Sequence, residues 1–180
     1  MGKHMMHILR EVMNSQIKLA VLVFLGMVGV ISTVLAFEHL GGYIPCALCL
    51  EQRTPYYIGI PVAFISLLAI GMKWPQILVR SALAICGLLV MWSLALAAYH
   101  TGVEWAWWPG PSECSAPDSG NSAVTLAENL MNQLSFSKPP ACDEAAGRFL
   151  GLSFAGWNVV VSACIAFLAF RGAMLRNTNN

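Results

Sequence analysis

The sequence predicts an all-α membrane protein, a bundle of four transmembrane helices. Only 11% of the 180 residues are charged and 57% are hydrophobic, whereas soluble domains carry about 25% charged residues. The hydrophobic residues form four runs, at about 17–37, 56–72, 77–99 and 152–170, each near the ~20 residues that a helix needs to cross a bilayer. We expect one membrane domain over residues 1–180. A net charge of +1 gives no indication of nucleic-acid binding.

The ends of the runs indicate how they are connected. The first run has no small-residue cleavage site at its end, which reads Phe37-Glu38-His39, so we expect it to remain as a membrane span. The second run is the shortest, and we expect its helix to continue beyond the hydrocarbon. The second and third runs are joined by a tight turn at residues 73–76.

Basic residues are divided unevenly between the two sides of the predicted bundle. One side would hold Lys3, Arg10, Lys18, Lys73, Arg80, Arg171 and Arg176. The other would hold Arg53, Lys138 and Arg148, with every acidic residue except Glu11. Because basic residues near span ends favour the cytoplasm, both termini are predicted to be cytoplasmic. Residues 38–55 and 100–151 then form two exported loops.

The second exported loop contains a pattern typical of a short amphipathic helix. Its apolar residues recur at helical spacing, at Ala123, Leu126, Ala127, Leu130, Met131 and Leu134. Asn121 or Ser122 is placed to cap it. The segment is too short and too polar to span, so we expect it to lie along the membrane surface. The alternative is a loop helix that packs on the other exported segment.

Topology divides the six cysteines into two groups. Cys86 and Cys164 fall inside hydrophobic runs, where we expect a thiol to serve as a small apolar packing group. The other four lie in the exported loops, where disulfides persist. These are Cys46, Cys49, Cys114 and Cys142.

The Cys46-Ala47-Leu48-Cys49 motif has three interpretations: half of a zinc site, a structural disulfide, or a redox-active pair. A zinc site needs two more ligands at suitable spacing, and Cys114 and Cys142 are isolated from each other. A structural bridge across so short a loop constrains the unfolded chain weakly. The redox interpretation is therefore favoured, and no metal ligand is predicted.

Arg53 strengthens the redox interpretation. If the second helix begins near Cys46, then Cys49 and Arg53 are four residues apart and share a helix face. A nearby guanidinium favours the thiolate, which is the form that attacks disulfides. The alternative is that Arg53 is anchored among lipid headgroups.

The remaining candidates lie in or near the second loop. Cys114 and Cys142 form either a static disulfide or a second redox pair, and neighbouring prolines keep both out of regular helix. His100 is placed to form a hydrogen bond at the membrane interface. Together with Glu104, one helical turn later, it is also placed to line a polar mouth for a headgroup.

Three segments together resemble the DsbB family of disulfide bond formation proteins. Residues 45–53 (PCALCLEQR) are similar to the family's first exported loop. Residues 99–104 (YHTGVE), residues 108–111 (WPGP) and Cys114 are similar to the start of its second loop, and Cys142-Asp143, residues 149–153 (FLGLS) and Trp157 to its end. The resemblance extends over about residues 15–172.

The resemblance implies a four-helix protein of the bacterial inner membrane that reoxidises a periplasmic DsbA-like oxidase of thioredoxin fold. The electrons would pass to a membrane quinone, either ubiquinone or menaquinone. In that family, the residue matching Cys114 is attacked by the partner's reduced cysteine, Cys142 then exchanges with Cys46, and Cys49 meets the quinone. Arg53 and His100 match residues near the quinone. The alternatives are a paralogue that serves one dedicated partner, or a non-catalytic membrane protein that is disulfide-stapled or binds metal.

Overall fold

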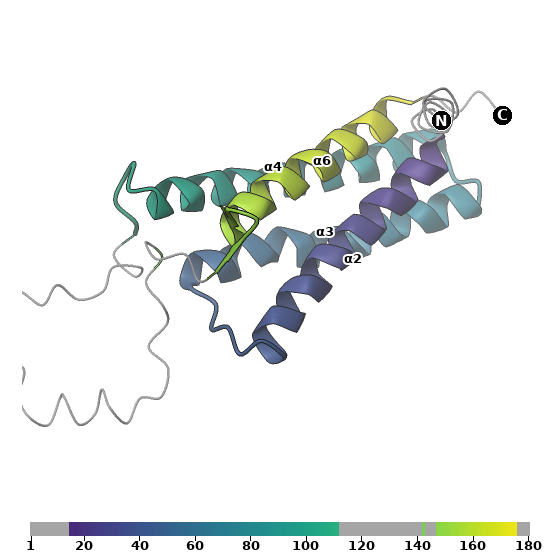
Figure 1. Cartoon of the computed structure of the whole chain (residues 1–180). Coiled ribbons are helices and arrows are strands. Elements are labelled where there is room, and N and C mark those ends of the chain that lie inside the picture. The colour runs from purple at the N-terminus through teal and green to yellow at the C-terminus, as the bar shows by residue number, and fades with distance from the viewer. Residues whose placement is uncertain (1–14, 112–141, 143–146, 176–180) are drawn as a thin grey trace, which may run out of the picture.

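In the computed structural model, the described residues are 15–111, 142 and 147–175. They form four long helices: α2 (Gln16–His39), α3 (Ala47–Gly71), α4 (Gln76–Glu104) and α6 (Phe154–Met174). All four are long and apolar enough to cross a membrane, which confirms the predicted four-span bundle (Figure 1). Cys114 and the predicted loop helix near residues 121–134 lie outside the described residues.

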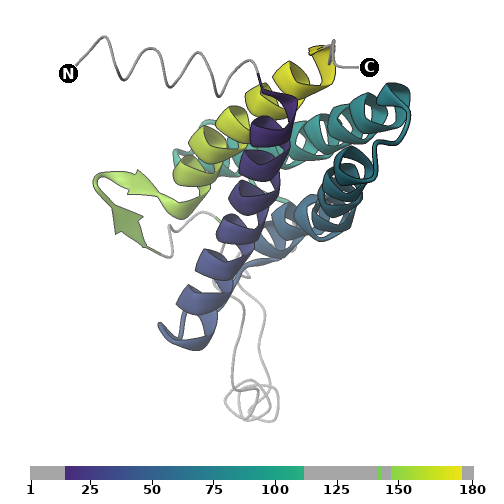
Figure 2. The same cartoon turned by 90° about the vertical axis from the view of Figure 1, so that its right-hand side faces the viewer.

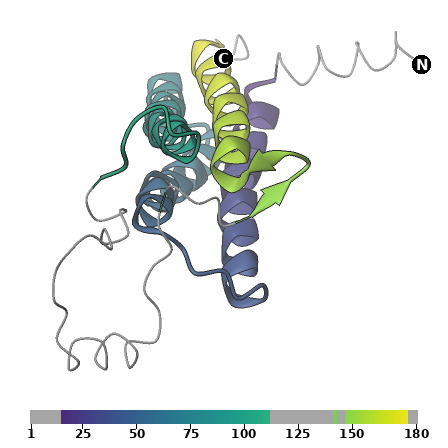
Figure 3. The same cartoon turned by 60° about the vertical axis from the view of Figure 1, so that its left-hand side comes forward.

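The helices run alternately up and down. α2 and α4 end, and α3 and α6 begin, at one end of the bundle, which we call the cysteine end because Cys46 and Cys49 lie there (Figure 1). Viewed from another side, α6 lies between α4 and α2 (Figure 3). α6 packs more extensively on α4 than on α2, and α2 diverges from α6 toward the cysteine end (Figure 1).

A short hairpin leads into α6 at the cysteine end. Strands β1 (Arg148–Phe149) and β2 (Leu152–Ser153) pair antiparallel, and the turn between them contains Leu150 and Gly151, both with positive φ. Figure 2 shows the hairpin projecting sideways from the start of α6. The Ser153 side chain then caps α6 by accepting a hydrogen bond from the Gly156 amide at 3.1 Å.

The helices at the cysteine end are longer than the hydrophobic runs indicated. α3 begins at Ala47, well before its hydrophobic run, as expected, so the second half of the predicted exported segment 38–55 is helical. Similarly, α4 continues to Glu104 instead of ending near residue 99. Hydropathy locates only the lipid-embedded part of a helix. The additional polar residues at the start of α3 and the end of α4 are helical because of their caps and their packing neighbours. The Cys46 sulfur provides the α3 cap, accepting from the Cys49 amide at 3.3 Å.

The centre of the bundle is apolar and closely packed. Its buried side chains come from every helix and include Val23, Met27, Tyr56, Val90 and Ile165. Cys86 belongs to this core and is fully buried, as the sequence predicts. Cys164 is instead exposed on the outside of α6, because it follows the core-facing Ser162 by two residues and therefore points away from the core.

Polar side chains tie the helices together at the end opposite the cysteines. The Gln16 amide donates to the Gly172 carbonyl oxygen at 3.1 Å, and Gln76 donates to Gln16 Oε1 at 2.7 Å. The Arg80 guanidinium donates to the Ala173 carbonyl oxygen at 2.7 Å. These bonds connect α2, α4 and α6 and touch none of the residues at the cysteine end.

Gly102 permits a close approach at the end of α4, and Gly102→Ala should destabilise the protein by about 1–3 kcal/mol, the usual cost of overpacking. A Cβ atom there would lie 2.1 Å from Trp108 Cζ2. The Trp108 indole is rigid and cannot easily move away. Its Nε1–H donates to the Tyr99 carbonyl oxygen at 3.1 Å, and its ring stacks on the Tyr99 ring. Thermal unfolding in detergent would measure the loss.

Gly29→Ala is the matched control for this prediction. Gly29 also lies within a transmembrane helix, but a Cβ atom there meets nothing within 4 Å. We expect Gly29→Ala to leave the unfolding midpoint unchanged or to raise it slightly, because alanine has the higher helix propensity. Equal behaviour of the two variants would contradict the packing argument.

Candidate redox site

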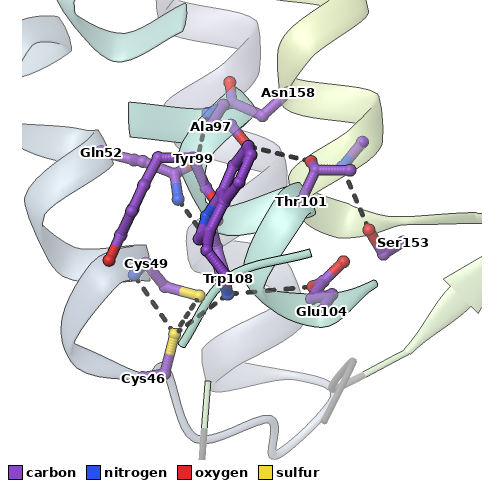
Figure 4. A network of polar contacts seen from close by, with 12 residues as sticks. Cys46, Cys49, Gln52, Ala97, Tyr99, Thr101, Glu104, Trp108, Ser153 and Asn158 are labelled. Carbon is purple, nitrogen blue, oxygen red and sulfur yellow. Dashed lines mark hydrogen bonds and ion pairs between the residues drawn. The ribbon is translucent and has the colours of Figure 1, made fainter. Parts of the chain in front are cut away.

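Cys46 and Cys49 face each other at the start of α3. Cys46 is the N-cap residue and Cys49 lies in the first turn, so the backbone of a helix start places their sulfur atoms 2.8 Å apart (Figure 4). Both thiols are free, Cys46 being buried and Cys49 half-buried. The pair can therefore cycle between dithiol and disulfide with little backbone movement.

His100, near the end of α4, reaches the same sulfur. Its Nε2 atom lies 3.8 Å from Cys46 Sγ and 3.8 Å from a carboxylate oxygen of Glu104. Its other ring nitrogen, Nδ1, lies 2.9 Å from the amide nitrogen of Gln52. His100 therefore adjoins the redox pair, and Glu104, one helical turn later, lies beside His100.

The surroundings of Cys46 favour its thiolate form. The pKa of Cys46 is lowered from the ordinary thiol range, chiefly by the hydrogen bond that its sulfur shares with the Cys49 thiol. Burial opposes this shift, while His100 and the Cys49 backbone amide add to it. The hydrogen-bond donors therefore converge on Cys46. The thiolate of the pair is thus favoured on Cys46 and not on Cys49, so the sequence-based prediction assigned it to the wrong cysteine.

Cys142 comes to the same place from a distant part of the chain. It is disulfide-bonded and buried, and it shares one apolar cluster with Cys46, Leu48 and Val103, against which Cys49 also packs. Three of the four predicted exported cysteines are thus gathered around the start of α3. The fourth, Cys114, is not among the described residues.

Arg53 lies one turn after Cys49 on α3, as the spacing requires. Its side chain is 9% exposed, and Nη1 donates to Glu38 Oε2 at 2.5 Å. This ion pair joins α3 to the end of α2. The Nε atom of Arg53 is buried and has no hydrogen-bond partner among the described residues. An unpartnered buried donor costs free energy, so this N–H is available to an acceptor that enters the site.

An apolar cavity of about 420 Å³ opens beside these residues. Its walls come mainly from the part of α2 that diverges and from the beginning of α6, with Val30, Val34 and Val161 among them. Its polar end is lined by Cys49, Gln52, Arg53, His100 and Asn158. A flat ring with carbonyl oxygens and an apolar tail matches this division, so the residues present fit a quinone.

Three polar residues at this site were not among the sequence predictions. Gln52 and Asn158 bind each other between α3 and α6 at 2.7 Å, and Glu38 holds Arg53. One signal was available: Asn158 is a polar residue at the start of a hydrophobic run, and such residues usually have a function in membrane proteins. The partners themselves could not be found, because they belong to different helices.

The site offers three atoms that bind metals. Cys46 Sγ, Cys49 Sγ and a ring nitrogen of His100 all lie within 4.8 Å of one another. A closed structural zinc site takes four protein ligands, and no fourth joins this group among the residues that the structure describes.

A Cys-x-x-Cys pair at the polar end of an apolar cavity, within a four-helix membrane bundle, defines a multi-pass membrane protein built for dithiol chemistry. The family model described as "Disulfide bond formation protein DsbB" matches residues 16–171. The chain therefore belongs to the DsbB family.

Proteins named "Disulfide bond formation protein B" are similar over most of the chain. That of Saccharophagus degradans is 31% identical, covering 78% of this chain and 82% of that protein. That of Dechloromonas aromatica is 28% identical, covering 81% and 84%, and that of Nitrosomonas eutropha is 28% identical, covering 82% and 88%. No solved structure matches.

Proposed function

We propose that this protein is a quinone-dependent protein-disulfide oxidoreductase of the bacterial inner membrane. In this proposal it reoxidises a DsbA-like periplasmic oxidase of thioredoxin fold and passes the electrons to the membrane quinone pool. The observation that carries the proposal is the burial of Cys142 against the Cys46–Cys49 pair, at the polar end of an apolar cavity. The uneven distribution of basic residues supports a periplasmic position for the cysteine end.

The first half of the reaction would transfer two electrons from the partner to a Cys114–Cys142 disulfide. A partner thiolate attacks the Cys114 sulfur, and Cys142 leaves as a thiolate. The partner's second thiolate then attacks the mixed disulfide and releases Cys114. The partner leaves with a disulfide, and both loop cysteines are reduced.

The second half would move those electrons to the buried pair. The Cys142 thiolate attacks the Cys46 sulfur of an oxidised Cys46–Cys49 pair, and Cys49 leaves. Cys114 then attacks Cys142, and Cys46 leaves. The shared cluster supports the first contact, and the lowered pKa of Cys46 supports the last step, because a thiol of low pKa is the better leaving group.

A bound quinone would supply the oxidising power by accepting two electrons and two protons from the Cys46–Cys49 pair. Of the residues present, Cys49 lies at the cavity's polar end, where it would deliver the electrons. Arg53 has an unpartnered Nε–H to donate to an acceptor, and His100 lines the same end. The apolar walls on α2 and α6 would hold the ring and exclude water.

The test is a reaction of the purified full-length protein with a reduced DsbA-like oxidase and a short-chain ubiquinone or menaquinone. We expect one quinone to disappear for every two partner thiols oxidised, measured by quinone absorbance and thiol titration. Comparing several DsbA-like oxidases as substrates distinguishes an enzyme that accepts many partners from a paralogue that serves one dedicated partner. A partner that stays reduced would overturn the proposal.

The two non-catalytic alternatives give different results in a simpler assay. Acid quenching and alkylation, with and without quinone, report the redox state of the four cysteines. A stapled scaffold would keep them unchanged, whereas the proposed enzyme would oxidise them when quinone is added. Stoichiometric metal that remains through purification would favour the metal-binding alternative.

A further inference from the structure

A chain of hydrogen bonds crosses three helices and ends at the redox pair. It begins on α6, where the Asn158 amide nitrogen donates to Gln52 Oε1 at 2.7 Å. The Gln52 amide nitrogen on α3 lies 2.9 Å from His100 Nδ1. His100 Nε2 on α4 then lies 3.8 Å from Cys46 Sγ, within reach of a hydrogen bond to sulfur. Figure 4 shows Asn158 and Gln52 on the inner side of the two cysteines.

The orientation of the Asn158 side-chain amide in the structure sets the direction of this chain. Asn158 Oδ1 accepts from the Tyr56 hydroxyl at 3.1 Å and from the Ser162 hydroxyl at 3.1 Å. The amide nitrogen of Asn158 is therefore left to donate to Gln52. The side-chain oxygen of Gln52, Oε1, accepts this hydrogen bond. The side-chain NH₂ group of Gln52 therefore faces the His100 ring.

The next bond determines the tautomer of His100. A nitrogen that faces an NH₂ donor must itself accept, so Nδ1 carries no proton. In a neutral imidazole the proton then lies on Nε2. That atom is the one beside Cys46 Sγ, so the ring presents an N–H donor to the sulfur. The backbone of Gln52 is also held in place, because the Ser93 hydroxyl donates to the backbone carbonyl oxygen of Gln52 at 3.1 Å.

We propose that Gln52 and Asn158 are positioning residues that hold His100 in its Nε2–H tautomer, with this proton directed at the Cys46 sulfur. A donor to the sulfur stabilises the thiolate over the thiol. Cys46 is thereby prepared to leave as a thiolate when the buried pair is reduced. The role of Cys46 as a leaving group rests on the proposed function. The tautomer of His100 and its effect on the Cys46 thiolate do not.

The other charged and titratable groups around this chain are few. α3 contributes Cys49, Arg53 and, at the far end of the chain, the Tyr56 hydroxyl. Arg53 is paired with Glu38 of α2. α4 contributes Glu104, whose Oε1 lies 3.8 Å from the same Nε2 and competes with Cys46 for its proton. Cys142, which packs in the same cluster as Cys46, is disulfide-bonded in the structure and becomes a further titratable thiol, common to all variants, when the protein is reduced. In the described part of α6, the residue that faces the chain is the neutral Asn158.

The pH dependence of Cys46 alkylation tests the proposal, with peptide-resolved mass spectrometry of the reduced full-length protein. Gln52→Leu and Asn158→Leu should each raise the midpoint by about one pH unit, which lowers the alkylation rate below the midpoint about tenfold. Gln16→Leu is the matched control, since Gln16 is 5% exposed and Gln52 6% and both join helices. It should leave the midpoint unchanged.

The tautomer can be observed directly by ¹⁵N NMR of histidine-labelled protein. The chain has four histidines, and the His100 signals are assigned by their loss in His100→Asn. We expect an unprotonated Nδ1 in the wild-type protein and a mixture of tautomers in Asn158→Leu. A protonated Nδ1 in the wild type, or an unchanged midpoint in both leucine variants, would overturn the proposal.

These measurements require neither quinone nor partner. If quinone reduction fails while the midpoint shifts as expected, the proposed function is wrong and the positioning network stands. If quinone reduction succeeds but the midpoint of Cys46 alkylation is unchanged in both leucine variants, the proposed function stands and the positioning network is wrong. Should Gln52→Leu fail to fold, the wild-type tautomer and the Asn158→Leu midpoint still decide the matter.

Discussion

Cys49→Ser is expected to abolish steady-state quinone reduction while leaving Cys114 able to form a mixed disulfide with the partner. Cys49 is the cysteine of the buried pair that lines the polar end of the cavity, and a serine hydroxyl neither forms a disulfide nor donates electrons at this position. Loss of a redox nucleophile lowers turnover by about a thousandfold or more. Stopped-flow quinone absorbance and non-reducing gels measure the two halves separately.

Cys164→Ser is the control for this variant. Cys164 is also a free cysteine within the described chain, but it lies exposed on the outside of α6. It should reduce quinone at the wild-type rate. Quinone turnover by Cys49→Ser near that rate would show that another route carries the electrons, and the proposed relay would be wrong.

Arg53→Ala should raise the apparent KM for quinone about tenfold to a hundredfold, the range that corresponds to 1.5–3 kcal/mol for a hydrogen bond from a charged group. The buried Nε of Arg53 has no partner among the described residues and lies at the polar end of the cavity. It is therefore a donor that an incoming carbonyl oxygen can satisfy. Steady-state kinetics over a series of quinone concentrations would measure the change.

Two further variants separate quinone binding from loss of the ion pair. Arg53→Ala leaves Glu38 without its partner, so Arg53→Ala combined with Glu38→Gln removes that unpaired carboxylate. The double variant should keep the raised KM. Arg80→Ala, which loses an interhelical bond at the other end of the bundle, should not show it. A KM for quinone that stays at the wild-type value in Arg53→Ala would refute the role assigned to this residue.

The relation between Arg53 and Cys49 shows how much of the site could be predicted from the sequence. Their spacing on one helix was sufficient to place them on a common face, and α3 includes both. The sequence did not indicate that Glu38, at the end of another helix, holds the guanidinium at 2.5 Å. Nor did it indicate that the donors around the redox pair converge on Cys46, because this depends on the cap geometry and on a ring from α4.

The sequence by itself determined the four spans, the position of the Cys-x-x-Cys motif at the start of one span, and the resemblance to the DsbB family. These follow from local patterns, because crossing a bilayer requires about 20 successive apolar residues and a motif is read along one segment. Only the tertiary structure decided which side chains meet. Cys142 packs against Cys46, and Asn158 reaches Gln52 across 106 residues of sequence. Partners from different helices are fixed by how the helices pack, which no single segment encodes.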